Sequence, residues 1–284
     1  MLPANLIIPE IHDYAGFITR DFAAATWRKW GIYRRAFPRK FRLYAVGVGK
    51  TGTHSMAAIF SRHHAVHEAD FYRTLMIANR ISKGETGQGI ERIIRERDER
   101  LFLEMEASHL LIDFVPALVR VYPEARFILT IRDPYSWMES TLNQTLRVQH
   151  RPRPPVVGEF FLRRNGPPSS APEEAHIAAM GLPSLDGMMG YYARAYSMLL
   201  DAVPQERLLV MRTPEIGKRL PEIAAFAGVP VQSLKPEAAH RYRGVVKAKL
   251  LQALPPDYLR GIVEKHASVL IARYFPDAKA PGAA

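Results

Sequence analysis

Apolar residues follow two rhythms along the chain: short uninterrupted runs, and spacings of three or four residues. The uninterrupted runs predict buried β-strands at 42–48, 65–68, 100–106, 125–131 and 207–211. The longer spacings predict helices at 53–62, 72–82, 89–97, 110–122, 135–147, 186–203, 215–227 and 256–274. Because strands and helices alternate, we expect one α/β domain in which helices flank a central parallel sheet on both faces.

Three segments lie outside this alternating pattern. Residues 1–41 predict one or two basic amphipathic helices before the domain. Residues 150–184 are dense in proline, glycine and charge and are too long for an ordinary connection, which predicts an irregular insertion, either disordered or a functional lid. Residues 276–284 predict a frayed tail. The domain itself is therefore expected at 42–275.

The composition narrows the class of protein. The sequence has no apolar run long enough for a transmembrane helix, and its start lacks the basic region and cleavage site of a signal peptide. It has no cysteine, which excludes disulfides, thiolate metal sites and cysteine nucleophiles. These features together favour a cytoplasmic protein.

The charge points to anionic ligands. A net charge of +11 attracts nucleic acid, a membrane surface or a phosphorylated small molecule. Part of the excess lies at 28–42, where aromatic residues separate the basic ones; this segment is either a solvated basic helix or a peripheral contact with an anionic membrane. No nucleic-acid-binding module is recognised, so nucleic acid is not an expected partner. The sequence carries no signal for the oligomeric state.

The stretch AVGVGKTGTHSM at 45–56 carries the first chemical signal. Its "GKT" (Gly49–Thr51) matches the end of a Walker A loop, although Tyr44 stands where the first glycine of that loop belongs. A glycine-rich turn from a strand into a helix presents backbone N–H groups at the positive end of the helix dipole, which favours an anion. Lys50 adds a cation, and further donors are the hydroxyl groups of Thr51, Thr53 and Ser55. The alternative is a glycine-rich turn without a ligand.

A second signal lies in FILTIRDPYSWMES at 127–140. Arg132 follows a buried strand directly, at the edge where open α/β sheets bind ligands. Ser140 lies two helical turns further on and can face the same site, so the pair suits a second phosphate. The alternative for Arg132 is an ion pair with Asp133 or Glu139. Two anion sites favour a nucleotide with two separated phosphates over ATP.

These residues resemble two motifs of the sulfotransferases that use 3′-phosphoadenosine 5′-phosphosulfate (PAPS). KTGTHS (Lys50–Ser55) resembles their 5′-phosphosulfate loop, and RDPYSWMES (Arg132–Ser140) resembles their 3′-phosphate motif. A weaker likeness continues at 206–216 and 241–244. Gly49 and Ser55 replace the proline and tryptophan usual in the family, which suits its bacterial and carbohydrate-type branches. The resemblance implies the P-loop NTPase-like sulfotransferase fold.

The resemblance also implies roles for individual residues. Lys50 would neutralise charge on the transferred sulfuryl group and on the leaving phosphate. The 5′-phosphate would lie against the loop formed by Gly49, Lys50, Thr51, Gly52, Thr53, His54 and Ser55. The 3′-phosphate would be bound by Arg132 and Ser140. Weaker matches imply that Arg212 lies near the adenine and that the 3′-phosphate is covered by Arg241, Arg243 and Gly244.

Sulfuryl transfer to a hydroxyl group also needs a general base. His109 and Glu68 each follow a predicted strand and are equal candidates by their order along the chain. Glu106 is a third candidate, either as the base or as a group that orients His109. The alternative for each is a helix cap or a surface ion pair. The histidine-rich stretch 63–68 does not place three ligands on one face, so no metal is expected.

We therefore expect a PAPS-dependent sulfotransferase whose acceptor is a hydroxyl or amine group on a carbohydrate, a glycolipid or another small metabolite. Two other classes remain open. A P-loop kinase or NTPase would need Mg²⁺ and ATP, although Arg132 stands where the acid of a Walker B strand belongs. A non-catalytic protein that binds anions or membranes through its basic N-terminus is the other.

Overall fold

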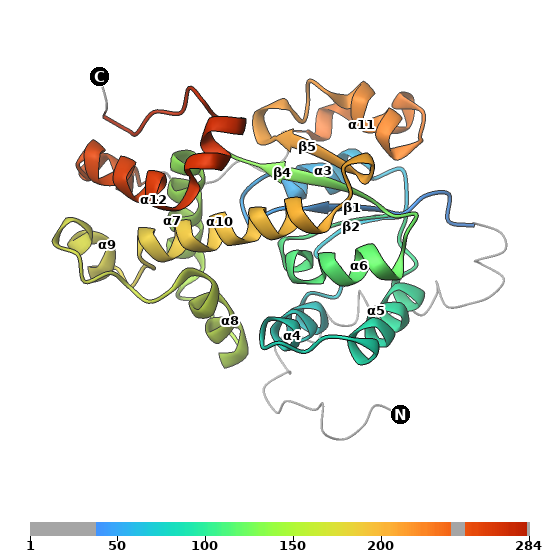
Figure 1. The fold of residues 1–284 in the computed structure, drawn as a ribbon, viewed down its shortest axis with the longest axis horizontal. Helices are drawn as coiled ribbons and strands as arrows, with labels where there is room; N and C mark the ends of the chain where they lie inside the picture. The colour runs from blue at the N-terminus through green and yellow to red at the C-terminus, as the bar shows by residue number, and fades with distance from the viewer. Residues whose placement is uncertain (1–37, 240–247, 283–284) are drawn as a thin grey trace.

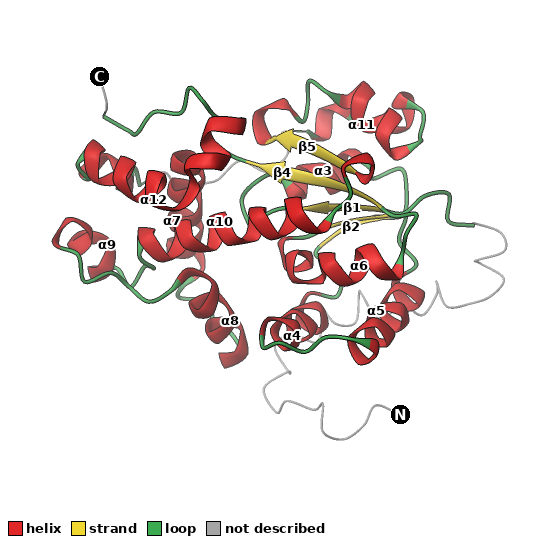
Figure 2. Ribbon diagram, viewed as in Figure 1, coloured by secondary structure: helices red, strands yellow, loops and turns green. Residues whose placement is uncertain are grey.

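A five-stranded parallel sheet forms the centre of the computed structural model, which describes residues 38–239 and 248–282 (Figures 1 and 2). Its strands lie side by side in the order β2-β3-β1-β4-β5, and every pair is parallel. Their bounds are β1 (Leu43–Val46), β2 (Ala65–His67), β3 (Met105–Ala107), β4 (Arg126–Ile131) and β5 (Leu208–Arg212).

Helices cover both faces of this sheet (Figure 1). Those in the described chain are α3 (Thr53–Ile59), α4 (Phe71–Ser82), α5 (Gln88–Leu101), α6 (Val115–Val121), α7 (Pro134–Val148), α8 (Pro155–Asn165), α9 (Ala175–Ala179), α10 (Leu185–Ala202), α11 (Leu220–Ala227) and α12 (Pro256–Tyr274). Short 3₁₀ helices connect them, among them η3 (His109–Phe114), η4 (Pro172–Glu174), η6 (Thr213–Glu215) and η8 (Pro236–Ala238).

Alternate side chains of the central strands enter two separate cores. Tyr44 and Val46 of β1, with Phe127 of β4, pack among α4, α6 and α10 on one face. Leu43 and Ile128 pack against α3 and α11 on the other. Because both faces are buried, the strands are almost continuously apolar, and this pattern made the α/β fold predictable. The expected central parallel sheet is confirmed.

The structure corrects the prediction that 150–184 is irregular. This segment contains α8, η4 and α9. Val157 and Phe160 stand three residues apart and are buried on one face of α8, which explains why a helix forms there. Prolines and glycines at the ends of these short helices mark where they begin and stop, although their density in the sequence had indicated an absence of helix.

Two further boundaries differ from the prediction. The expected strand at 100–106 begins only at Met105, because α5 continues to Leu101. The expected tail at 276–284 is packed rather than frayed as far as residue 282, since Ala280 is buried against the larger core. The predicted N-terminal helical segment at 1–41 falls almost wholly outside the described residues.

The parallel arrangement decides where the chemistry of this chain gathers. All strands end at one edge of the sheet, so the residues that follow them become neighbours. At this edge Gly47 lies against β4, where an added Cβ atom would meet the backbone oxygen of Thr130 at 2.3 Å. The start of the loop after β1 is therefore packed too tightly for any residue with a side chain.

Candidate active site

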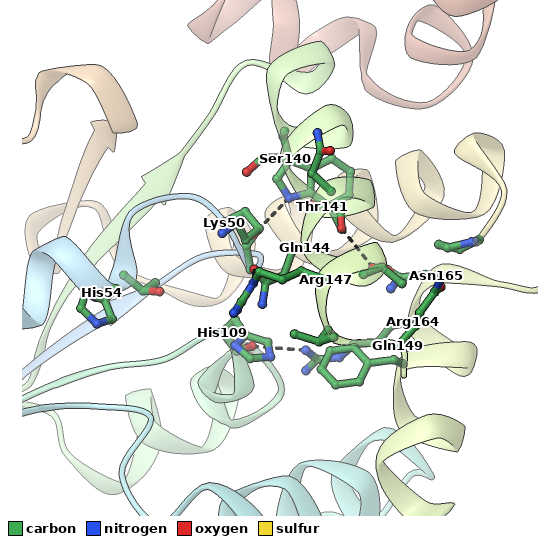
Figure 3. Close-up of a pocket in the computed structure, with 18 of the residues that line it drawn as sticks. Lys50, His54, His109, Ser140, Thr141, Gln144, Arg147, Gln149, Arg164 and Asn165 are labelled. Carbon is green, nitrogen blue, oxygen red and sulfur yellow. Dashed lines mark hydrogen bonds between the residues drawn. The ribbon is translucent and has the colours of Figure 1, made fainter. Parts of the chain in front are cut away.

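A cavity of about 1520 Å³ opens at the carboxyl edge of the sheet. Its walls come from the loop after β1, the ends of β2 and β3, one face of α7, and parts of α4 and α8. Figure 3 shows Lys50, His109 and Arg147 directed into it from three different elements. Ligands of open α/β sheets bind at this edge, so the cavity is the candidate active site.

The loop after β1 is held by side chains on its carbonyl oxygens. The carbonyls of Val48–Thr51 accept hydrogen bonds from the side chains of Thr51, Trp137, Arg132 and Thr213, at 2.7, 2.8, 3.2 and 2.7 Å respectively. The N–H of a peptide unit points opposite to its C=O, so this anchoring turns the N–H groups away from these partners. Of the sequence-predicted loop residues, those that line the cavity are Gly49, Lys50, Gly52, Thr53, His54 and Ser55.

The backbone of the loop adopts a left-handed conformation twice. Lys50 has φ 73° and Gly52 has φ 102°. An added Cβ at Gly52 would also meet the side chain of Ile216 at 2.7 Å. Gly52 is the N-cap of α3 and offers that helix no side-chain cap, and the N-terminal end of α3, where the helix dipole is positive, lines the cavity. Thr51 differs from the prediction, because its hydroxyl faces the core and bonds Val48 and Thr130.

Lys50 occupies a strongly positive environment. Burial and the nearby guanidinium groups of Arg132 and Arg147 lower the pKa of Lys50 from 10.5 to about 8. The ammonium form is thus disfavoured in the protein alone. An anion placed beside Lys50 would reverse this effect, so the arrangement favours binding of a negatively charged group.

Arg132 and Ser140 both line the cavity, as the sequence predicts. Arg132 donates to the Ser136 hydroxyl at 3.1 Å as well as to the loop, and burial lowers its pKa. The proposed acid partners of Arg132 have other tasks. Asp133 accepts from the Ser136 N–H and caps α7, whereas Glu139 accepts from the N–H groups of Leu250 and Leu251.

Glu68 and His109, weighed separately from the sequence, form one hydrogen-bonded pair. Glu68 Oε1 lies 2.7 Å from His109 Nδ1, and both residues line the cavity. Burial acts to raise the pKa of Glu68, but the charge and hydrogen bond of His109 outweigh it and lower that pKa to about 2. In the neutral state of the ring, an ionised Glu68 accepts the Nδ1–H, and Nε2 is the nitrogen that can take up a proton. The ring of Phe161 stacks on His109 with centroids 5.9 Å apart.

The structure does not bring Glu106 to the cavity. Glu106 is 2% exposed, and its carboxylate accepts from both terminal nitrogens of Arg97, at 2.5 and 2.7 Å. Glu106 lies inside β3, and its side chain contacts Arg97 of α5 on one face of the sheet, whereas Glu68 and His109 follow the ends of their strands. Glu106 is therefore neither a base nor the group that orients His109.

The structure describes only some of the residues of the two late motifs. The exposed Arg212 pairs with Glu215 and lines a separate hollow of about 210 Å³, so the structure does not bring its side chain to the cavity. Arg241, Arg243 and Gly244 lie outside the described residues. Of their flanks, Ala239 lines the cavity and the N–H of Ala248 donates to Asn143 on α7.

A sequence match decides the family. Residues 42–236 match the family described as "Sulfotransferase domain". This chain belongs to the sulfotransferase family. The match covers all five strands and the loop, histidine and arginine of the cavity, and it agrees with the resemblance expected from the two phosphate motifs.

Three solved structures are similar to this chain at low sequence identity. A sulfotransferase from Alicyclobacillus acidocaldarius is 16% identical (TM-score 0.47, 81% of this chain and 96% of that one). Sulfotransferase STF9 from Mycobacterium avium is 12% identical (0.48, 92% and 83%). The sulfotransferase domain of the Synechococcus PCC 7002 olefin synthase is 12% identical (0.39, 80% and 87%). No curated protein matches this sulfotransferase at a significant level.

Several residues of the site were not predicted from the sequence. Trp137 and Thr213 hold the loop through its carbonyls, and Phe161 stacks on the histidine from a helix that was not expected. Arg147 stands seven residues after Ser140 and so shares its helix face, which the sequence could have indicated. Within 38–239 and 248–282, no group of three potential ligands could hold a metal ion. The same residues contain no helix long and apolar enough to cross a bilayer.

A variant of the Arg97–Glu106 pair tests whether Glu106 stabilises the fold. Glu106→Gln leaves a buried guanidinium without its carboxylate, so we expect a loss of about 3 kcal/mol in unfolding free energy, measured with urea. The control Glu85→Gln removes an exposed pair with Arg80 and should leave the urea midpoint unchanged. An unchanged midpoint in Glu106→Gln would contradict the structural role.

Proposed function

We propose that this sulfotransferase transfers the sulfuryl group of PAPS to a hydroxyl or amine group of a small-molecule acceptor. One observation carries the proposal: the positively charged loop at Lys50 and the Glu68–His109 pair face the same cavity. An anion site next to a histidine base is the combination that group transfer from a charged donor to a hydroxyl requires.

The residues of the cavity fit the donor. The backbone of Gly49–Ser55 and Lys50 suit the 5′-phosphosulfate, because their N–H groups and ammonium supply donors and charge in one place. Arg132 and Ser140 suit the separate 3′-phosphate from the first half of α7. The tight contact at Gly52 supports this fit, since a side chain there would meet Ile216 and spread the loop. Arg241, Arg243 and Gly244 stay a prediction from the sequence motif.

The chemistry divides between the donor and the side chains of this chain. When bound, PAPS supplies a sulfuryl group whose S–O bond to the 5′-phosphate breaks as the acceptor oxygen attacks sulfur. His109 Nε2 takes the proton of the attacking hydroxyl, and Glu68 holds the ring through Nδ1 and stabilises the imidazolium that forms. Lys50 stabilises the charge that develops on the leaving phosphate oxygen.

A binding experiment separates this proposal from the two rival classes. By calorimetry in EDTA, we expect the desulfated product PAP to bind with a dissociation constant on the order of micromolar. Arg132→Ala removes a charge-assisted contact and should weaken binding at least about tenfold, whereas Arg212→Ala, outside the cavity, should not change it. A preference for ATP–Mg²⁺ would favour a kinase or NTPase. Binding only to anionic vesicles would favour a membrane-docking protein.

The Glu68–His109 pair predicts a split between turnover and donor binding. With any hydroxyl acceptor that the wild type uses, His109→Ala should lower kcat by about 10² to 10⁴ while the affinity for PAP stays nearly constant. Glu68→Gln should lower kcat less, because the amide still positions the ring. The pair Asp186–His266 has a 2.8 Å contact outside the cavity. The matched control variants His266→Ala and Asp186→Asn should therefore keep full turnover. Normal kcat in His109→Ala would rule out this base.

A further inference from the structure

A second histidine, His67, lines the cavity beside the Glu68–His109 pair. His67 is the last residue of β2, and its Nε2 lies 3.2 Å from the hydroxyl oxygen of Thr53. Thr53 is the first residue of α3 and follows Gly52 directly, so its hydroxyl belongs to the loop that would bind the 5′-phosphate of the donor. His67 therefore connects the sheet directly with the proposed donor loop.

An unusual backbone turn brings His67 and Glu68 to the same cavity. Consecutive residues of a strand point to opposite faces of the sheet, yet these two both line the cavity. Glu68 has φ 52°, so the chain enters the left-handed conformation directly after β2. A residue with a side chain keeps this conformation only where its surroundings hold it. Glu68 Oε1 lies 2.7 Å from His109 Nδ1 and 3.7 Å from His67 Nε2, so one carboxylate stands between the two histidines.

The position of this carboxylate decides which nitrogen of His67 carries the proton. Burial lowers the pKa of His67 to about 4, so the ring is neutral at pH 7 and has one N–H. The ionised Glu68 lies near Nε2 and favours the tautomer with the proton there. The Nε2–H then donates to the oxygen of Thr53, which leaves the Thr53 O–H to donate to another acceptor.

We propose that His67 is a positioning residue for the sulfuryl donor. His67 donates from Nε2 to Thr53, and Thr53 donates its hydroxyl proton to an oxygen of the 5′-phosphate. Hydrogen bonds that run in one direction polarise each other, so this chain strengthens the contact with the anion. His67 acts through Thr53 in this role and is not a catalytic residue. The proposal rests on the function proposed above, since it concerns the donor of the same site.

A double-mutant cycle on the affinity for PAP tests this chain of hydrogen bonds. By calorimetry, we expect Thr53→Val to weaken binding about tenfold, because a hydrogen bond to a charged group is lost. His67→Leu should weaken binding about fivefold, since the Thr53 hydroxyl loses the donor that orients it. The double variant should bind PAP no more weakly than Thr53→Val, because His67 has no effect without the hydroxyl.

Conservative variants keep the test independent of a disturbed fold. Thr53→Ser keeps the hydroxyl, and His67→Gln keeps an N–H donor at the end of the side chain. Both variants should bind PAP within about twofold of the wild type if the hydrogen bonds, rather than the packing, are what matters. A loss in His67→Gln as large as that in His67→Leu would contradict the role of the N–H donor.

A similar pair outside the cavity supplies the control. His63 Nε2 lies 2.9 Å from the Ser233 hydroxyl, and His63 Nδ1 lies 3.7 Å from Glu104. His63→Leu should leave the affinity for PAP unchanged. Wild-type affinity in His67→Leu would overturn the proposal, and so would a loss from His67→Leu that is equally large with and without the Thr53 hydroxyl. Failure of the wild type to bind PAP would refute the proposed function instead.

Discussion

The rest of the site depends on the positive charge buried at the end of β1. Lys50 lies in the loop after β1, and Arg132 follows β4 directly beside that loop. Burial lowers the pKa of both side chains, and the charges of Arg132 and Arg147 lower the pKa of Lys50 further. The fold supports this arrangement through neutral contacts, since Trp137 and Thr213 hold the carbonyls of the loop. A loop fixed in this way presents charge and N–H groups to a ligand without having to rearrange, and an anion stabilises what the protein alone does not.

The parallel sheet also places the general base and its carboxylate partner. β2 and β3 are neighbours, with His67 in register with Ala107, so Glu68 and His109 emerge side by side although they are 41 residues apart. The carboxylate fixes which ring nitrogen carries the proton, and the packing of Phe161 fixes the plane of the ring. The donor loop and the base thus lie at one edge of the sheet because parallel strands all end there.

The sequence predicted the sheet, the two phosphate motifs and the base candidates because each has a local signal: an apolar run, a glycine-rich turn, or an arginine directly after a strand. The pairing of Glu68 with His109 could not be predicted, because neither local sequence pattern shows that β2 and β3 are neighbours. The sequence misjudged Glu106, whose partner Arg97 comes from α5, a helix with no sequence pattern that ties it to β3. It also took α8 for an irregular segment, because proline and glycine density obscured a short apolar face.

Proton uptake on binding of PAP tests most directly that Lys50 receives the anion. At pH 8.5, a lysine with a pKa of about 8 is about three-quarters neutral in the free protein, and a phosphate beside it favours the ammonium form. Calorimetry in two buffers of different ionisation enthalpy should therefore show uptake of roughly three-quarters of a proton at pH 8.5. Lys50→Arg, which does not titrate, should bind PAP with almost no uptake. The same proton uptake in both proteins, or none in the wild type, would contradict the account.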